Sequence, residues 1–206
     1  MKKKFKIYNT LDRKKINFVP LNEEHIKIYA CGPTVYNYAH IGNGRMAVVC
    51  DLLVKVLRTI YKKVTYVSNI TDIDDKIILA AKESNKKITD ITEKFLNIYN
   101  EDMSSLGVEK PSIQPKATDY INEMICLIET LLQNKNAYIM KEHVLFHVPT
   151  FKSYGVLSKR TLEEQIAGSR IEVAPFKKHP SDFVLWKPSK PDEPKWPSPW
   201  GEGRPG

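Results

Sequence analysis

The stretch that decides the fold of this chain is Ile26-Lys27-Ile28-Tyr29-Ala30-Cys31, followed by Gly32-Pro33 and then by His40-Ile41-Gly42-Asn43. Its alternating apolar residues predict a short β-strand over 26–31, which the glycine and the proline end. An apolar face at helical spacing over 46–60 predicts a long helix after the loop. A strand, a glycine-bearing loop and a helix in this order present backbone N–H groups to a phosphate. A histidine in that loop adds a donor for the charge that builds up in phosphoryl or nucleotidyl transfer.

The rest of the chain continues an α/β pattern. A second strand over 64–68 completes a β-α-β unit, and alternating runs at 138–140 and 144–148 predict a β-hairpin. Residues 187–206 contain six prolines and three glycines, so we expect an irregular loop there. Three further helices are expected, over about 72–80, 89–106 and 120–132.

Composition narrows the class of protein. The 206 residues carry a net charge of +8, which fits a polyanionic partner such as RNA, although a lysine-rich surface alone gives the same excess. No apolar region follows the first lysines, so a signal peptide is not expected, and no segment approaches a membrane span. Three widely spaced cysteines do not make a disulfide framework, and we expect a reducing cytoplasm as the location.

The cysteines and two histidines are candidate metal ligands. Cys31 ends the first strand, where open α/β sheets bind ligands, but a lone cysteine there is more often a small buried side chain. Cys50 and Cys126 both lie in apolar helical runs and are predicted to be core residues. His143 and His147 share strand parity and could pair on a metal, yet exposed hairpin histidines are the preferred interpretation.

A carboxylate cluster and a set of aromatic residues leave alternatives open. Asp72, Asp74 and Asp75 could hold Mg²⁺, but capping of the following helix is preferred, with Thr71 or Asp72 as the capping residue. Three tryptophans could stack on a base, but packing against prolines in a loop is preferred; they are Trp186, Trp196 and Trp200.

The motif from Cys31 to Arg45 resembles the first signature of class I aminoacyl-tRNA synthetases, and its leading cysteine makes it similar to the cysteinyl-tRNA synthetase family. Four further blocks resemble that family and follow in its order: Asn69–Lys76, Tyr154–Ser158, Asp182–Lys187 and Trp196–Gly206. The resemblance implies the first half of a Rossmann-like nucleotide-binding fold, a parallel sheet with flanking helices, over 1–115. It implies the start of a connective insertion over 116–206, ending in a Pro/Gly-rich loop. We therefore expect an N-terminal fragment of a longer protein.

The resemblance also implies the site. Asn43 stands where class I enzymes usually have histidine, and it keeps a neutral donor of similar reach. His40 and Asn43 are the expected catalytic residues. The expected ATP-binding residues are Pro33, Thr34, His40, Gly42 and Asn43. The expected amino-acid-binding residues are Cys31, Gly32 and Thr71. Cys31 is also the expected ligand of a Zn²⁺ that binds the substrate thiolate, because a soft thiolate is preferred by zinc over a hydroxyl.

The implied function is that of a cysteine–tRNA ligase. Such an enzyme uses Mg²⁺ and ATP to activate L-cysteine and transfers it to tRNA(Cys). We expect the protein to be a monomer and to have no membrane partner. A related ligase that joins cysteine to an amino sugar is one alternative, and a non-catalytic fragment that binds RNA or a partner is another. The family's second zinc-ligand cysteine and its Lys-Met-Ser-Lys-Ser loop are absent from these 206 residues, so we expect the fragment alone to be inactive.

Overall fold

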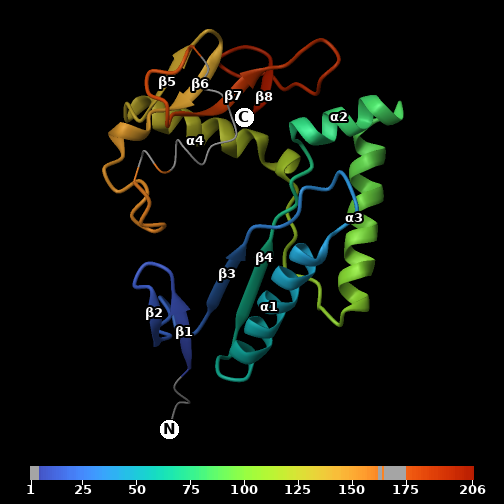
Figure 1. The fold of residues 1–206 in the computed structure, drawn as a ribbon, viewed down its shortest axis with the longest axis vertical. Coiled ribbons are helices and arrows are strands. Elements are labelled where there is room, and N and C mark those ends of the chain that lie inside the picture. Colours follow the sequence, from blue (N-terminus) through green and yellow to red (C-terminus); the bar gives the residue numbers. More distant parts are fainter. Residues whose placement is uncertain (1–4, 162–163, 165–174) are drawn as a thin grey trace. The chain divides into compact units, whose positions relative to one another are not determined.

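The computed structural model describes residues 5–161, 164 and 175–206 (Figure 1). They form two compact units, one of Phe5 with Asn17–Asp119 and one of Lys6–Ile16 with Tyr120–Gly206. No helix in these described ranges is both long enough and apolar enough to cross a membrane.

The first unit is built on a parallel pair of strands. Its elements are β3 (Ile26–Ala30), α1 (Ile41–Arg58), β4 (Val64–Ser68), α2 (Asp75–Ser84) and α3 (Ile88–Ser105). Strand β3 pairs in parallel with β4, in a register that places Ile26 opposite Val64 and Ala30 opposite Ser68. The predicted β-α-β unit and the α/β fold class are therefore confirmed, and α1 begins at Ile41, earlier than its apolar face indicated.

A proline-containing segment extends this sheet on the far side of β4. The Ser68 N–H donates to the Ile113 carbonyl over 3.1 Å, and the Ile70 N–H donates to the Pro115 carbonyl over 2.8 Å. The Ala117 N–H returns a bond of 2.9 Å to the Ile70 carbonyl. Pro115 accepts with its carbonyl and has no N–H to donate, so it fits an edge position in the sheet. A short 3-10 helix, η1 (Ala117–Tyr120), follows.

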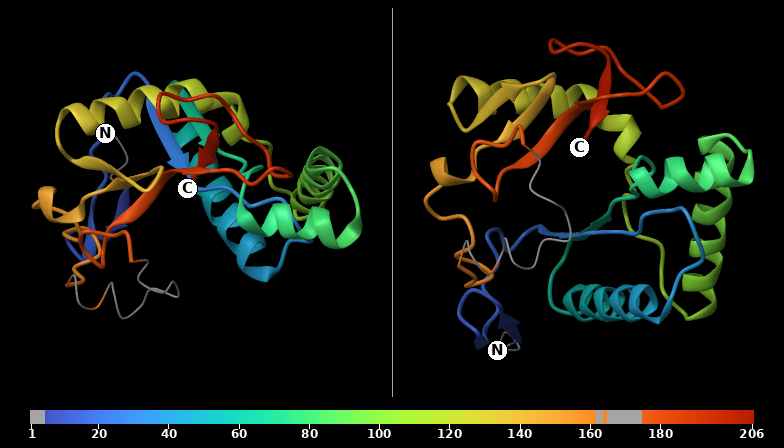
Figure 2. Two further views of the ribbon diagram at one scale, coloured as in Figure 1. Left: turned by 90° about the horizontal axis from the view of Figure 1, so that it is seen from above. Right: turned by 45° about the horizontal axis from the view of Figure 1, so that its top comes forward.

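The helices of this unit enclose its core. Helix α1 packs on β4 and on α3, and α2 packs on α3 (Figure 2). Ala47 of α1 meets Tyr99 and Met103 of α3 in one buried cluster. Leu57 and Ile77 are also fully buried, which accounts for the helical apolar spacing in the sequence.

The second unit combines a helix with an antiparallel sheet. Its elements are β1 (Lys6–Asn9), β2 (Lys14–Asn17, which crosses the unit boundary), α4 (Ile121–Gln133), β5 (Ala137–Met140), β6 (His143–Phe146), the 3-10 helix η2 (Val148–Thr150), β7 (Phe183–Pro188) and β8 (Gly203–Pro205). Strands β1 and β2 form a two-stranded sheet, and β5-β6-β7-β8 form a four-stranded one. The predicted hairpin is confirmed as β5 and β6, whose turn places Lys141 and Glu142 at positive φ. Helix α4 lies along this sheet, and its Ile121 and Ile128 pack with Ala137, Val144 and Trp186 (Figure 1).

The irregular loop expected over 187–206 is only partly correct. Strand β8 lies inside that range and pairs with β7, with Lys187 opposite Arg204. Gly203 makes this possible, because a Cβ there would collide with the Lys187 carbonyl and the Trp186 ring. Trp186 belongs to β7, is 1% exposed and meets Trp200 edge-on at 6.0 Å, so it is a core residue and not a loop residue. Pairing between segments so far apart in the sequence leaves no local signal.

Candidate functional site

The carboxyl ends of β3 and β4 bring three predicted site residues together. The Gly32 N–H donates to the Asn69 side-chain oxygen over 2.9 Å, and any Cβ on Gly32 would overlap the Asn69 backbone carbonyl. The Thr71 N–H donates to the Pro33 carbonyl over 3.0 Å, and the Thr71 carbonyl accepts from Val35. Cys31, Gly32 and Thr71 therefore lie at one edge of the sheet, and the Cys31 side chain is exposed there.

The next feature is the start of α1, where His40 and Asn43 form a reciprocal capping box. The Gly42 N–H donates to His40 Nδ1 over 3.0 Å, and the His40 N–H donates to Asn43 Oδ1 over 3.1 Å. Because His40 Nδ1 accepts, a neutral ring carries its proton on Nε2. Two side chains that the sequence suggested for one site are thus fixed by the same helix terminus.

The ring of His40 lies directly beside Gly42. A Cβ at Gly42 would lie 2.7 Å from His40 Cε1 and 3.0 Å from His40 Nδ1. The absence of a side chain at this position therefore lets the imidazole fold over the first turn of α1 and accept the Gly42 N–H.

A pocket of about 400 Å³ lies beside this helix terminus. Four of the predicted ATP-binding residues line it: Pro33, Thr34, His40 and Asn43. The remaining lining residues come from the loop, from α2 and from α3, and the sequence analysis assigned none of them an individual role; they are Val35, Tyr36, Asn37, Tyr38, Ala39, Lys76, Phe95 and Tyr99. Lys76 ends the Asn69–Lys76 block that resembles the family, and this block is the sequence signal that could have selected it.

The structure corrects the expected cap of the second helix. Asp74 is the capping residue of α2, and its carboxylate accepts from the Lys76 N–H over 2.8 Å. Asp72 instead accepts from the Thr118 N–H over 3.0 Å and from the Thr118 hydroxyl over 2.6 Å. Thr71 is engaged with the loop after β3. The expectation that Thr71 or Asp72 caps the helix is therefore wrong, because both face neighbouring segments that are distant in sequence.

The cysteines differ in accessibility from what the sequence suggested. Cys126 is exposed on α4, whose buried face carries Ile121 and Ile128, so its prediction as a core residue is wrong. Cys50 is half-buried in α1. In the described part of the chain no three Cys, His, Asp or Glu side chains are grouped closely enough to hold a metal. Cys31 can offer one thiolate, which is fewer than the three or four protein ligands that zinc takes.

The two hairpin histidines are engaged and half-buried, so their prediction as exposed side chains is wrong. His143 Nδ1 donates to the Lys141 carbonyl over 2.7 Å, and the ring stacks on Phe176 at 4.5 Å. His147 Nδ1 donates to Asp182 over 3.1 Å. The two rings therefore face different partners and do not form a metal pair.

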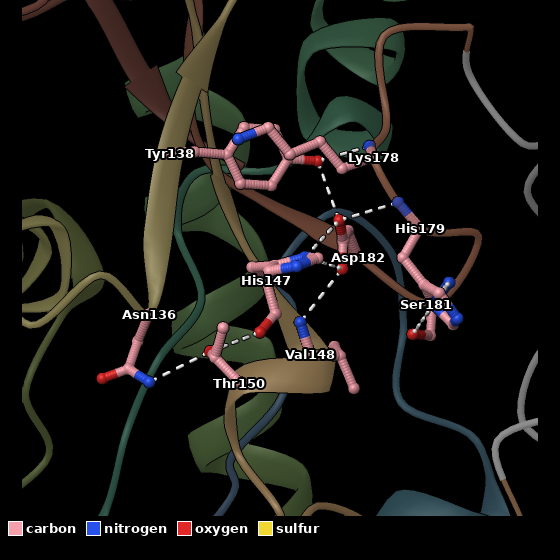
Figure 3. Close-up of polar contacts among 9 residues, drawn as sticks. All are labelled: Asn136, Tyr138, His147, Val148, Thr150, Lys178, His179, Ser181 and Asp182. Carbon is pink, nitrogen blue, oxygen red and sulfur yellow. Dashed lines mark hydrogen bonds and ion pairs between the residues drawn. The ribbon is translucent and has the colours of Figure 1, made fainter.

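Asp182 is the centre of a buried polar network in the second unit (Figure 3). Its side chain is fully buried, and it accepts from Tyr138 Oη over 2.8 Å and from the N–H groups of Val148 and His179 over 3.0 Å each. Burial, with the Asp182 carboxylate adding to it, raises the pKa of Tyr138 to about 12. A buried carboxylate with this many donors joins β5, η2 and the turn before β7.

Most of the chain matches one known protein family. A family model described as tRNA synthetases class I (C) catalytic domain matches residues 17–206. The cysteine–tRNA ligase of Parvibaculum lavamentivorans is 57% identical over 205 residues, covering 100% of this chain and 44% of that protein. The cysteine–tRNA ligase of Saccharophagus degradans is 54% identical over 200 residues, covering 97% of this chain and 44% of that protein. That of Pelagibacter ubique is 52% identical over 208 residues, covering 100% and 46%. The chain thus spans less than half the length of these curated relatives.

Proposed function

Because this chain belongs to the class I (C) tRNA synthetase catalytic-domain family, we propose that the protein is a cysteine–tRNA ligase. In the first step a carboxylate oxygen of L-cysteine attacks the α-phosphate of Mg·ATP, which forms cysteinyl-adenylate and releases pyrophosphate. In the second step a hydroxyl of the terminal ribose of tRNA(Cys) takes the cysteinyl group and AMP leaves. Protein synthesis in the cytoplasm is the proposed setting.

The observation that carries this proposal is the fixed ring of His40. Its Nδ1 is engaged by the Gly42 N–H, so the Nε2–H of the neutral ring is available to a phosphate oxygen. Asn43 accepts with its side-chain oxygen, and its amide NH₂ remains a second neutral donor. Donors held in place before the reaction stabilise the charge that develops on phosphate, and little general-base chemistry is required.

The amino-acid side of the proposal rests on the strand ends. We assign Gly32 and Thr71 to the walls of the cysteine site, because the Gly32 N–H bonds to Asn69 and the Thr71 N–H bonds to the Pro33 carbonyl at the edge where Cys31 is exposed. We assign Cys31 as one thiolate ligand of Zn²⁺, with the other ligands outside the described residues. When bound, zinc would hold a substrate thiolate in preference to a hydroxyl, which size alone discriminates weakly.

The two alternatives have less support. The three relatives compared above are all named cysteine–tRNA ligases, not amino-sugar ligases. None of these three names describes a non-catalytic RNA-binding or partner-binding protein either. We also retain the proposed division into a nucleotide-binding half over 1–115 and an insertion over 116–206. The unit boundary after Asp119 supports it, whereas Lys6–Ile16 belong to the second unit.

Cysteine-dependent exchange of pyrophosphate into ATP by the whole natural protein tests the proposal. Exchange with L-cysteine, little exchange with L-serine, and charging of a tRNA(Cys) transcript are the expected results. An amino sugar that accepts the activated cysteine in place of the tRNA would support the first alternative. Exchange that is equally weak with and without L-cysteine would overturn the proposed activity.

A further inference from the structure

A buried carboxylate beside the candidate cysteine site has no role in the proposed chemistry. Asp72 is 7% exposed, and it directly follows Thr71 in the chain. Its Oδ1 accepts from the Thr118 N–H over 3.0 Å, and its Oδ2 accepts from the Thr118 hydroxyl over 2.6 Å. A buried charge is costly unless it is hydrogen-bonded, and a bond to a charged group contributes more than a neutral one. The pair of Asp72 and Thr118 therefore firmly links two segments that lie 46 residues apart in the chain.

The chain that leads from β4 to Asp72 is held from both sides. On one side the Ile70 N–H donates to the Pro115 carbonyl over 2.8 Å. On the other side the Thr71 N–H donates to the Pro33 carbonyl over 3.0 Å, and the Thr71 carbonyl accepts from the Val35 N–H over 3.2 Å. All these residues belong to the first unit, so this arrangement lies within one compact body. The link from Asp72 to Thr118 secures the end of this chain.

The same chain carries the contacts that form the edge of the cysteine site. The Gly32 N–H donates to Asn69 Oδ1 over 2.9 Å, and Cys31 is exposed next to it. Thr71 holds the loop that follows Gly32. A site of this kind binds its ligand well only where its walls are fixed before binding, because a displacement of about 1 Å is costly. Release of the chain at Asp72 would therefore loosen the wall formed by Thr71.

We propose that Asp72 is a positioning residue of the cysteine site, which acts through Thr118 to hold Thr71 against the loop after β3. The inference rests on the proposed function, because that function places L-cysteine at this edge of the sheet. ATP binding should depend on the link less, since the capping box of His40 and Asn43 is made within the first turn of α1.

The substitution Thr118→Val in the whole natural protein tests the proposal. Valine has nearly the shape of threonine and keeps the backbone N–H, but it lacks the hydroxyl that donates to Asp72. Pyrophosphate exchange measures kcat and the KM for each substrate, and equilibrium dialysis measures binding of L-cysteine without turnover. The KM and the dissociation constant for L-cysteine should rise about tenfold, because a hydrogen bond to a charged group is lost. The KM for ATP should change less than threefold, and Thr118→Ser, which keeps the hydroxyl, should restore cysteine binding.

The substitution Asp72→Asn separates positioning from direct contact with the substrate. An asparagine amide can accept from the Thr118 N–H with its oxygen and donate to the Thr118 hydroxyl with its NH₂, so both contacts are kept without the charge. The KM for cysteine should therefore stay within about threefold of the wild-type value, whereas Asp72→Ala should raise it at least tenfold. An increase as large in Asp72→Asn as in Asp72→Ala would show that the charge itself is required, and would overturn the positioning role.

Thr92→Val is the matched control for the loss of a threonine hydroxyl. Thr92 is buried in α3 of the same unit, and its hydroxyl donates to the Thr89 carbonyl over 3.1 Å. Its substitution should leave each KM within about twofold of the wild-type value, even where urea unfolding shows a loss of stability like that of Thr118→Val. An equal rise of the KM for cysteine in both variants would show a general effect of destabilisation and would contradict the proposal.

The outcomes distinguish this inference from the proposed function. If the wild-type protein shows cysteine-dependent exchange while Thr118→Val binds L-cysteine as tightly as the wild type does, the positioning role is refuted and the proposed function stands. If the wild-type protein shows no such exchange, the proposed function fails, and the positioning role fails with it.

Discussion

The substitution Gly42→Ala tests whether catalysis depends on the position of the His40 ring. The added Cβ would lie 2.7 Å from His40 Cε1 and 3.0 Å from His40 Nδ1, closer than ordinary contact. Because the imidazole is a side chain that can rotate, we expect the ring to move by several tenths of an ångström or more. That movement breaks the 3.0 Å bond from the Gly42 N–H to His40 Nδ1 and displaces Nε2.

The expected effect on stability is small. Loss of the cap costs about 0.5–2 kcal/mol, and replacing glycine by alanine within a helix returns up to about 1 kcal/mol. The net change in the free energy of unfolding should therefore stay within about 1 kcal/mol. The effect on activity should be large, since loss of one preorganised donor slows the chemical step on the order of 10²–10³-fold. Activity and stability are thus expected to separate.

Single-turnover formation of cysteinyl-adenylate measures the activity, and urea unfolding measures the stability. Gly44→Ala is the matched control, because its Cβ would meet only Leu106 Cδ1 at 3.3 Å and lies away from the His40 ring. His40→Ala sets the full size of the effect. A Gly42→Ala protein that forms adenylate at the wild-type rate would refute the role given to the ring position.

Three further predictions concern other parts of the chain. Cys31→Ser in the whole natural protein should remove about one equivalent of zinc and raise the KM for cysteine at least tenfold. Cys126→Ser should change neither quantity. Metal analysis and exchange kinetics check this, and retained zinc would contradict the ligand assignment. Asp182→Asn should lower the free energy of unfolding by about 2–4 kcal/mol, because an NH₂ would then face buried donors; a loss below about 0.5 kcal/mol in urea unfolding would contradict the network. The unfolding free energy should fall as the pH rises from 10 to 12, since folded Tyr138, with a pKa of about 12, keeps a proton that the unfolded chain loses near pH 10. Tyr138→Phe should reduce this slope, and an unchanged slope would contradict it.

Much of the backbone was predictable from local patterns. Alternation over β3, β4 and the β5–β6 hairpin, and 3.6-residue spacing in α1 and α3, each arise because one face of the element is buried. The motif from Cys31 to Asn43 placed a loop between a strand end and a helix start, and the structure has this arrangement. The spacing of apolar residues shows which face of an element is buried, whichever element covers that face.

The features that failed or were missed depend on contacts between distant segments. Asp72 and Asp74 are chemically equivalent in the sequence, and only the approach of Thr118 decides that Asp72 leaves the cap of α2 to Asp74. Strand β8 exists because Gly203 admits the Lys187 carbonyl.

The same distinction applies to the site. The sequence by itself placed His40 and Asn43 in a loop between a strand and a helix. The structure added that the helix begins at Ile41, with His40 and Asn43 as a capping box made within four consecutive residues. Only the tertiary structure brought Lys76 to the pocket beside them, since α2 and the loop after β3 meet through packing and not through adjacency in the chain. Contacts within one turn of a helix depend on neighbouring residues, whereas a pocket depends on how the whole fold brings distant segments together.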